Sequence, residues 1–511
     1  MNKRQVVRVL VALALVASAC SSGGQADQDD VNACGAERVF GDDVAPLTVA
    51  GVVSERWSVE TDEATFSSPR TADLNGDGVL DIVQGFGQDT LGAKQSSVIA
   101  TDGATGEQIW RSTGHEDVIG SAVFAALGGD DTVDVVIGGR RGGLLALDGA
   151  TGSVLWTFDD QGGLWFNFYT SQLLPDQNGD GVVEVLAVNG GLVFDEPEEG
   201  TGMLDPDERH LGTVFVLSGA DGSVLVSVPV PDRGESYMSP VVLPGGTSGD
   251  VELLIGTGGE TLPGGLWKWS LAALIERDAA PAEELVNGGS KGVIASPVVA
   301  DMNADCVADI VVQAFDGTVS LIDGVTGDHL WVIKNAGFET YSTPTLGYFV
   351  GDDSIPDVFA SVANGVWPEY ESSDYLLIDG ATGEIVWRET RGTFAPSGFV
   401  AADVNGDGRD EVIFGVNDIG ADTQQMFVLD PSRLELHPLG EPLPQTAFSA
   451  PWIGDLDADG QLDLIVTASS YQPPMGPAMV RRLVLAWPAP DAVTWGGYLG
   501  TVGTGSLGAD D

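Results

Sequence analysis

Short apolar runs flanked by Gly, Asp, Asn and Pro recur along the chain from about residue 50 to about residue 490. One set follows acidic loops and includes Asp81-Ile-Val-Gln-Gly85 and Glu411-Val-Ile-Phe-Gly415. A second set, which includes Ser96-Ser-Val-Ile-Ala-Thr101, precedes Asp-Gly turns. Runs this short, rich in β-branched residues and bounded by turn formers, predict strands. The pattern therefore predicts an all-β protein.

An acidic pattern of nine residues, D-x-[DN]-x-D-x-x-x-[DE], occurs five times, and each copy leads directly into an apolar run. The copies span residues 73–81, 176–184, 301–309, 403–411 and 455–463, and Gly holds the sixth place in four of them. Oxygen side chains at alternate positions of a tight loop can converge on one ion, and Ca²⁺ takes about 6–8 oxygen ligands. The spacing therefore predicts calcium loops, with up to five sites.

The predicted ligands occupy positions 1, 3, 5 and 9 of each loop. They are Asp73, Asn75, Asp77 and Asp81; Asp176, Asn178, Asp180 and Glu184; Asp301, Asn303, Asp305 and Asp309; Asp403, Asn405, Asp407 and Glu411; and Asp455, Asp457, Asp459 and Asp463. The loop at 301–309 departs most from the pattern, because Ala304 and Cys306 replace glycines. An EF-hand is excluded, since no copy has Glu at position 12. The alternative is a set of Asx-rich turns that bind nothing.

A second signature alternates with the acidic loops. Residues 102–110, 148–156, 323–331 and 379–387 each begin with Asp, carry Thr-Gly at offsets three and four, and end in Trp. With the strands around it, this turn predicts a hairpin, so one repeat contains four strands. The Trp residues are expected to pack between repeats, because burying a large aromatic side chain is strongly favourable.

Counting these repeats predicts an eight-bladed β-propeller with four-stranded blades; seven blades is the alternative. Three degenerate units, at 126–134, 243–252 and 348–357, fill the long gaps between acidic loops but lack the complete ligand set. The last unit has no strand ending in Trp, whereas residues 52–59 carry an isolated one with Trp57. We expect this N-terminal strand to complete the last blade and close the ring.

The N-terminus has the features of an export signal. Residues 1–19 combine a basic start with a short apolar stretch, and Val16-Ala-Ser-Ala-Cys20 resembles a bacterial lipobox, which implies lipidation of Cys20. An ordinary signal peptide ending in Ala-Ser-Ala is the alternative. Residues 20–48 are predicted to be a flexible tether, and 49–511 the propeller. Cys34 and Cys306 either pair or remain free.

The formal net charge is −54, from 76 acidic and 22 basic residues. Nucleic acids and anionic membranes bind basic patches, so we expect neither as a partner and membrane attachment only through the lipid. The expected location is the bacterial cell envelope, on the extracytoplasmic side, or outside the cell if the chain is secreted. We expect a monomer.

The acidic loops resemble FG-GAP/VCBS repeats, the type found in the integrin α-subunit propeller. The D-G-x-T-G-x-x-x-W strands resemble those of quinoprotein-like (PQQ-like) propellers and of outer-membrane-assembly propeller lipoproteins. These resemblances cover about residues 50 to 490 and imply the propeller fold and calcium ligation by the five loops. They leave function open, since propellers serve adhesion, scaffolding and catalysis.

The sequence carries no recognised catalytic motif, and its four histidines lie in different repeats without metal-ligand spacing. We therefore expect a binding, adhesion or scaffold module and not an enzyme; the alternative is a carbohydrate-active lyase or glycosidase. Insertions near residues 191–210, 262–289 and 367–370 are candidate contacts for a protein or glycan. The aromatic residues expected to bind it are Trp267, Trp269, Trp367 and Tyr370.

Overall fold

The computed structural model describes residues 38–41, 46–87, 96–115, 117–128, 132–139, 143–158, 167–191, 210–243, 250–259, 262–278, 280–366, 369–393, 398–445, 448–470 and 476–507. The predicted signal peptide, Cys20, Cys34 and Trp367 lie outside these residues, as do most of the insertion at 191–210 and parts of the degenerate units at 126–134 and 243–252.

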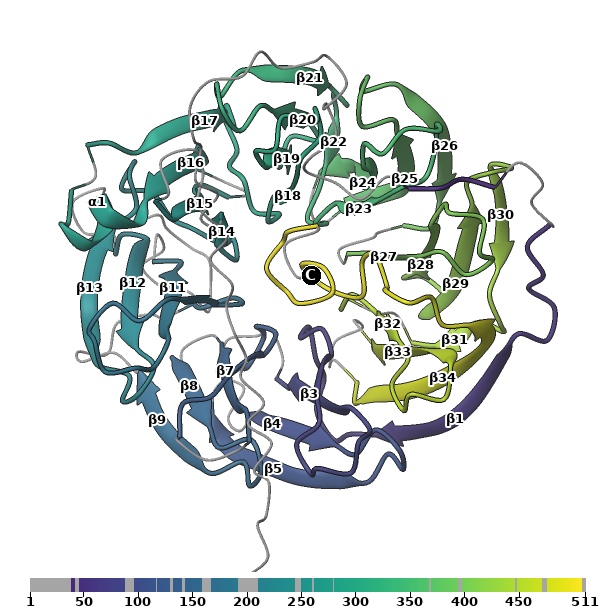
Figure 1. Ribbon diagram of the computed structural model, residues 1–511, viewed down its shortest axis with the longest axis horizontal. Helices are drawn as coiled ribbons and strands as arrows, with labels where there is room; N and C mark the ends of the chain where they lie inside the picture. The colour runs from purple at the N-terminus through teal and green to yellow at the C-terminus, as the bar shows by residue number, and fades with distance from the viewer. Residues whose placement is uncertain are drawn as a thin grey trace, which may run out of the picture.

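Eight antiparallel sheets form a closed ring, and each runs from an inner strand to an outer strand (Figure 1). The first four blades are built by consecutive strands in sequence order. Their strands are β2 (Arg70–Ala72), β3 (Asp81–Gly85), β4 (Ser96–Thr101) and β5 (Gln108–His115); β6 (Val123–Ala125), β7 (Asp134–Gly138), β8 (Leu144–Leu147) and β9 (Val154–Phe158); β10 (Gln172–Leu174), β11 (Glu184–Asn189), β12 (Thr213–Ser218) and β13 (Val224–Pro229); and β14 (Val241–Leu243), β15 (Glu252–Gly256), β16 (Gly265–Ser270) and β17 (Glu283–Asn287).

The remaining four blades follow the same plan, with one additional short strand in each of the sixth and seventh. Their strands are β18 (Val298–Ala300), β19 (Asp309–Gln313), β20 (Val319–Ile322) and β21 (His329–Ile333); β22 (Phe338–Glu339), β23 (Thr345–Gly347), β24 (Asp357–Val366), β25 (Glu369–Ile378) and β26 (Ile385–Arg391); β27 (Val400–Ala402), β28 (Glu411–Asp418), β29 (Thr423–Asp430), β30 (Glu435–Pro438) and β31 (Leu443–Pro444); and β32 (Trp452–Gly454), β33 (Gln461–Ser469), β34 (Ala478–Pro488) and β1 (Val53–Glu60). The predicted eight blades are confirmed, and the alternative of seven is wrong.

The eighth blade closes the ring by joining the two ends of the propeller. β1 pairs antiparallel with β34, so the outer strand of the last blade comes from the start of the chain. Figure 1 shows the purple β1 beside the yellow-green β34. This pairing was predicted from the position of Trp57. It gives the eighth blade its fourth strand and covers the edge of β34 that would otherwise be unpaired.

Burial along the strands explains the apolar runs in the sequence. The second strands are buried at nearly every position, as in β3 and β7, because neighbouring blades cover both faces of the sheet. The outer strands, such as β5 and β9, are only partly buried. Continuous apolar runs therefore belong to strands near the axis, and runs of mixed polarity to strands at the rim.

Within the described residues, a tryptophan and a glycine turn join successive blades at four places. The indole Nε1 of Trp110 donates to the carbonyl of Gly149 in the next blade at 2.7 Å. Trp57, Trp156 and Trp331 donate in the same way to Gly103, Gly219 and Gly380. A Cβ on the turn residue Gly152, whose φ is +68°, would lie 2.5 Å from the Trp110 ring, so only glycine fits beneath it. The Trp residues therefore pack between blades, as expected.

The segment after β34 returns to the centre of the ring, where Figure 1 shows it in yellow. It pairs with inner strands: Val299 with Ser506, and Ala401 with Trp495. The buried guanidinium of Arg70 donates to two of its carbonyls, on Tyr498 and Val502, both at 2.9 Å. The C-terminal segment 489–507 thus packs against inner strands in the middle of the propeller.

Two smaller features complete the fold. Helix α1 (Leu271–Ile275) follows β16, with the Ser270 side chain as its N-cap. The described end of the predicted tether packs on the propeller: Arg38 forms an ion pair with the buried Asp410 at 2.8 Å, and Gly41 N–H donates to the Asp407 carbonyl.

Among the residues with a described position, no helix has the length and hydropathy needed to span a bilayer.

Candidate metal centres in the acidic loops

All five acidic loops lie on one face of the ring. Each connects the first and second strands of a blade, and each Asp-Gly turn connects the third and fourth. Because neighbouring strands run antiparallel, these two connections emerge at the same end of the blade. The topology therefore places the first four acidic loops beside the turn between the third and fourth strands of their own blades, which the sequence spacing alone did not establish.

In the first loop the side chains at positions 1, 3 and 5 accept hydrogen bonds from the backbone of the same loop. Asp73 accepts N–H bonds from Gly76 at 2.7 Å and Gly78 at 3.1 Å. Asn75 Oδ1 accepts from Asp77 N–H at 2.9 Å, and Asp77 Oδ1 accepts from Val79 N–H at 2.8 Å. The side chains at positions 1, 3 and 5 are thus drawn into one compact turn.

The same bonds recur in the second, third and fourth loops. Position 1 accepts from the N–H of position 6 at 2.9 Å in each, and position 3 accepts from the N–H of position 5. In the third loop Ala304 and Cys306 adopt φ values of +61° and +70°, where the first loop has glycines at +76° and +88°. This loop therefore keeps the shared conformation although its sequence departs most from the pattern.

The ninth position is a buried carboxylate that ties the loop to the neighbouring turn. Asp81 has no exposed surface; it accepts from Leu74 N–H at 2.9 Å and from Gly103 N–H at 3.1 Å. Asp134 and Asp357 do the same in blades that lack the other ligands. This carboxylate is therefore a structural part of the blade, with or without a metal. An acid at the start of the second strand, such as Asp81 in β3 and Asp134 in β7, is the sequence signal for it.

Burial makes the negative charge of these carboxylates costly. It raises the pKa of Asp81 and Asp463, that of Asp309 to about 6, and that of Glu411 to about 9. In the blade of Glu411, Pro431 stands where the first and fifth blades have the turn glycines Gly103 and Gly324, and proline has no N–H to donate. Among the described residues, no Lys or Arg pairs with Asp81, Asp309 or Glu411. A bound cation would stabilise the negatively charged form of all three carboxylates.

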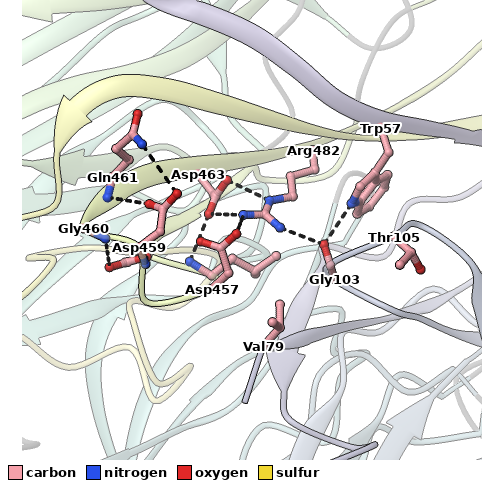
Figure 2. Close-up of polar contacts among 12 residues, drawn as sticks. Trp57, Val79, Gly103, Thr105, Asp457, Asp459, Gly460, Gln461, Asp463 and Arg482 are labelled. Atoms are coloured by element: carbon pink, nitrogen blue, oxygen red, sulfur yellow. Dashed lines mark hydrogen bonds and ion pairs between the residues drawn. The ribbon is translucent and has the colours of Figure 1, made fainter. Parts of the chain in front are cut away.

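The fifth loop differs, because a protein side chain supplies its cation. Figure 2 shows Arg482, from β34, reaching into the loop. Its Nε and Nη2 donate to the two carboxylate oxygens of Asp463 at 2.8 and 2.9 Å, and Nη2 donates to Asp457 at 2.6 Å. Ligand oxygens of Asp455, Asp457 and Asp463 lie within 4.8 Å of one another. Two of the loop's four carboxylates, Asp457 and Asp463, are thus paired with a positive charge, and Asp455 lies beside them.

These observations fit a hard cation in the first four loops. The side chains available are carboxylates and amide oxygens, the ligands that Ca²⁺ prefers. In the first loop Asp73, Asn75 and Asp77 could hold the ion, with Asp81 behind them. The ion would supply positive charge beside a buried acid and cross-link the turn. Sequence analysis found these residues but did not find Arg482.

The structure also places the other predicted site residues. Trp269 is fully buried and its indole N–H donates to the Asp278 carbonyl, so the prediction that it contacts a partner is wrong. Trp267 is half-buried, and its indole N–H donates to Thr257. Tyr370 is also half-buried, and its hydroxyl donates to Glu339 at 2.8 Å. Cys306 is disulfide-bonded; since Cys20 and Cys34 lie outside the described residues, its pairing with Cys34 stays a prediction.

Comparison with known proteins supports part of the predicted resemblance. The family described as outer membrane protein assembly factor BamB, with PQQ-like repeats, matches residues 94–201. No curated protein is significantly similar in sequence. The FG-GAP/VCBS resemblance of the acidic loops remains a prediction.

Solved structures of similar fold include two dehydrogenases. The quinohemoprotein alcohol dehydrogenase from Comamonas testosteroni is 12% identical, with a TM-score of 0.53 over 88% of this chain and 78% of that chain. A europium-containing methanol dehydrogenase is 12% identical, with a TM-score of 0.57 over 86% and 95%. BamB from Moraxella catarrhalis is 16% identical, with a TM-score of 0.46 over 84% and 98%.

The dehydrogenases contradict the prediction that the chain is not an enzyme. That prediction relied on missing catalytic motifs, yet enzymes are found among propellers of this shape. A cofactor can carry the chemistry while the protein binds and orients it, so a chain without a familiar motif can still be catalytic. At this level of identity the likeness establishes the fold alone.

Proposed function

We propose that this protein is a calcium-stabilised β-propeller of the bacterial envelope, anchored through lipidated Cys20, that serves as a binding or scaffold module. The propeller supplies a rigid ring, and calcium in the acidic loops fixes one face of it. Long connections on the opposite face are left to engage a protein or glycan.

The observation that carries the calcium proposal is the combination found in the first four loops: carboxylate and amide oxygens at positions 1, 3 and 5 folded into one turn, beside a buried ninth-position acid. Glu411 is the clearest example of a buried acid whose negative charge is unfavourable. Burial and the nearby Asp407, Asp403 and Asp430 raise its pKa to about 9. A buried charge is tolerated when it is paired or coordinates a metal. The fifth loop supports this interpretation, because there Arg482 provides the missing charge.

A matched pair of variants tests the calcium proposal. Asp77 in the first loop and Asp353 in the degenerate sixth-blade loop make the same turn bond, to Val79 N–H and Ile355 N–H. Asp73 and Asn75 precede Asp77 by four and two residues, whereas Phe349 and Gly351 stand at these places before Asp353. We expect Asp77→Ala to reduce the rise in melting temperature on adding calcium to EDTA-treated protein, and Asp353→Ala to leave that rise unchanged. Equal responses would contradict calcium binding in the first loop.

Envelope location is supported by the lipobox-like sequence ending at Cys20 and by the match to the assembly-factor family over residues 94–201. Fractionation of cells expressing the full chain tests it. We expect the protein in the membrane fraction and Cys20→Ser in the soluble fraction. Retention of Cys20→Ser on membranes would contradict lipid anchoring at this residue.

The binding role is tested by capture of partners on the whole mature protein, with calcium and with EDTA, together with a glycan array. A specific protein or glycan ligand retained in calcium supports the proposal. Binding that is unchanged when the connections from β11 to β12 and from β15 to β16, which emerge on the opposite face, are shortened would contradict their role. Release of a modified glycan would assign catalysis to the same face.

A further inference from the structure

The fifth acidic loop is built differently from the other four, although its spacing is the same. Its third position is Asp457, whereas the other loops have Asn75, Asn178, Asn303 and Asn405. In those loops the Asn side-chain oxygen accepts the N–H of position 5, as Asn75 accepts from Asp77 at 2.9 Å. Asp457 instead directs an oxygen to Arg482 at 2.6 Å.

The strand register shows that Arg482 is a substitution within a repeated position. Ile465, two residues after Asp463, pairs with Arg482. The residue in the same register pairs with Val83 in the first blade and with Val136 in the second, and it is Ala100 and Ala146 respectively. A site that holds a methyl group in those blades thus holds a guanidinium in the eighth.

Closure of the ring explains why the eighth blade needs this cation. In the first blade, Gly103 of the Asp-Gly turn donates its N–H to the ninth-position Asp81. The eighth blade has no such turn, because its third and fourth strands are β34 and β1, from opposite ends of the chain. Arg482 fills this gap with two bonds to Asp463, and its Nη1 also donates to the Gly103 carbonyl of the first blade at 3.0 Å.

We propose that Arg482 takes the place of the metal in the fifth loop, so that this loop excludes calcium and the chain binds four calcium ions. The guanidinium is 1% exposed and bonds to Asp457 and to both oxygens of Asp463, two of the four predicted ligands. A second cation there would have to displace it or be repelled by it at close range. This inference rests on the proposed calcium binding and corrects the predicted number of sites.

Calcium stoichiometry tests the inference on the whole mature protein. EDTA-stripped protein is titrated with calcium chloride by calorimetry. We expect four ions in the wild type, three in Asp77→Ala and four in Asp457→Ala, because only the first variant removes a ligand from an occupied loop. Loss of an ion in Asp457→Ala would overturn the inference. Asp457→Ala keeps the paired bonds between Arg482 and Asp463, so it is expected to fold.

Arg482→Ala recreates the side chain of the first two blades and is expected to gain an ion, giving five. A count equal to that of the wild type would overturn the inference. If the wild type binds no calcium, the proposed calcium function fails. Arg482→Ala still decides the inference in that case: a gain of one ion supports it, and no gain overturns it. If Arg482→Ala does not fold, the comparison of Asp77→Ala with Asp457→Ala decides alone.

Discussion

The contact between the eighth and first blades has a second donor that the contact between the first and second blades lacks. Trp57 and Trp110 are 9% and 6% exposed, and each indole N–H donates to a turn carbonyl, of Gly103 at 2.8 Å and of Gly149 at 2.7 Å. Gly103 also accepts from Arg482 at 3.0 Å. Among the described residues, Trp110 is the one side chain that donates to Gly149.

Replacing each Trp by Phe therefore has different consequences. Both changes remove similar volume and one hydrogen bond, which contributes a net of about 0.5–1.5 kcal/mol. Trp110→Phe also leaves a buried carbonyl without its donor, for which the penalty is about 1–3 kcal/mol. We expect Trp110→Phe to lower the free energy of unfolding by about 1 kcal/mol more than Trp57→Phe.

The assay is urea unfolding followed by circular dichroism, with calcium held constant, because the substituted Trp would distort a fluorescence signal. Trp156→Phe is the matched control: Trp156 is likewise the only described side-chain donor to Gly219, so it should behave like Trp110→Phe. In an Arg482→Ala background, the cost of Trp57→Phe should rise towards that of Trp110→Phe. Equal costs for Trp57→Phe and Trp110→Phe in the wild-type background would refute the assignment of Arg482 as second donor.

Three further predictions concern other parts of the ring. Gly152→Ala should lower the urea midpoint at least twice as much as Gly289→Ala, because both have φ near +70° but only Gly152 has a ring 2.5 Å from the added Cβ; equal shifts would contradict the packing. Burial raises the pKa of Asp357 from 3.8 to about 7, so the folded state binds this proton more tightly, and its contribution to stability falls as pH rises from about 4 to 7, by at most roughly 4 kcal/mol. Asp357→Asn should flatten the pH dependence of urea unfolding over that window, and an unchanged slope would contradict this. Burial lowers the pKa of Arg70 to about 10, but it stays charged, and Arg70→Met should make the segment 489–507 more sensitive to limited proteolysis; unchanged cleavage would contradict its role in holding that segment.

The blade count could be predicted because each blade repeats two local signals. The acid before the second strand must lie where backbone N–H groups need an acceptor, and the Trp must lie where the next blade presents a glycine turn. Each signal occupies nine residues and recurs from blade to blade, so spacing reveals the repeat although each Trp donates to a glycine 39 to 63 residues further on. Even the closing strand carried its own marker in Trp57, which made the pairing with β34 predictable.

Contacts set by strand register or by the packing of the chain end could not be predicted in this way. Arg482 and Asp463 are 19 residues apart, and their contact depends on which residue of β34 lies opposite Ile465. The segment 489–507 has no periodic pattern, so nothing in it predicted a place at the centre of the ring. Trp267 and Trp269 look alike in the sequence, yet only the first keeps exposed surface.

Thermal unfolding of the whole mature protein with calcium and with EDTA tests the central claim most directly. An ion bound only by the folded state raises the free energy of unfolding by RT ln(1 + [L]/Kd). This is about 2.7 kcal/mol for each site when the calcium concentration is 100 times Kd. The proposed function predicts a higher melting temperature in calcium, with a rise that grows with calcium concentration. The same melting temperature in calcium and in EDTA would contradict it.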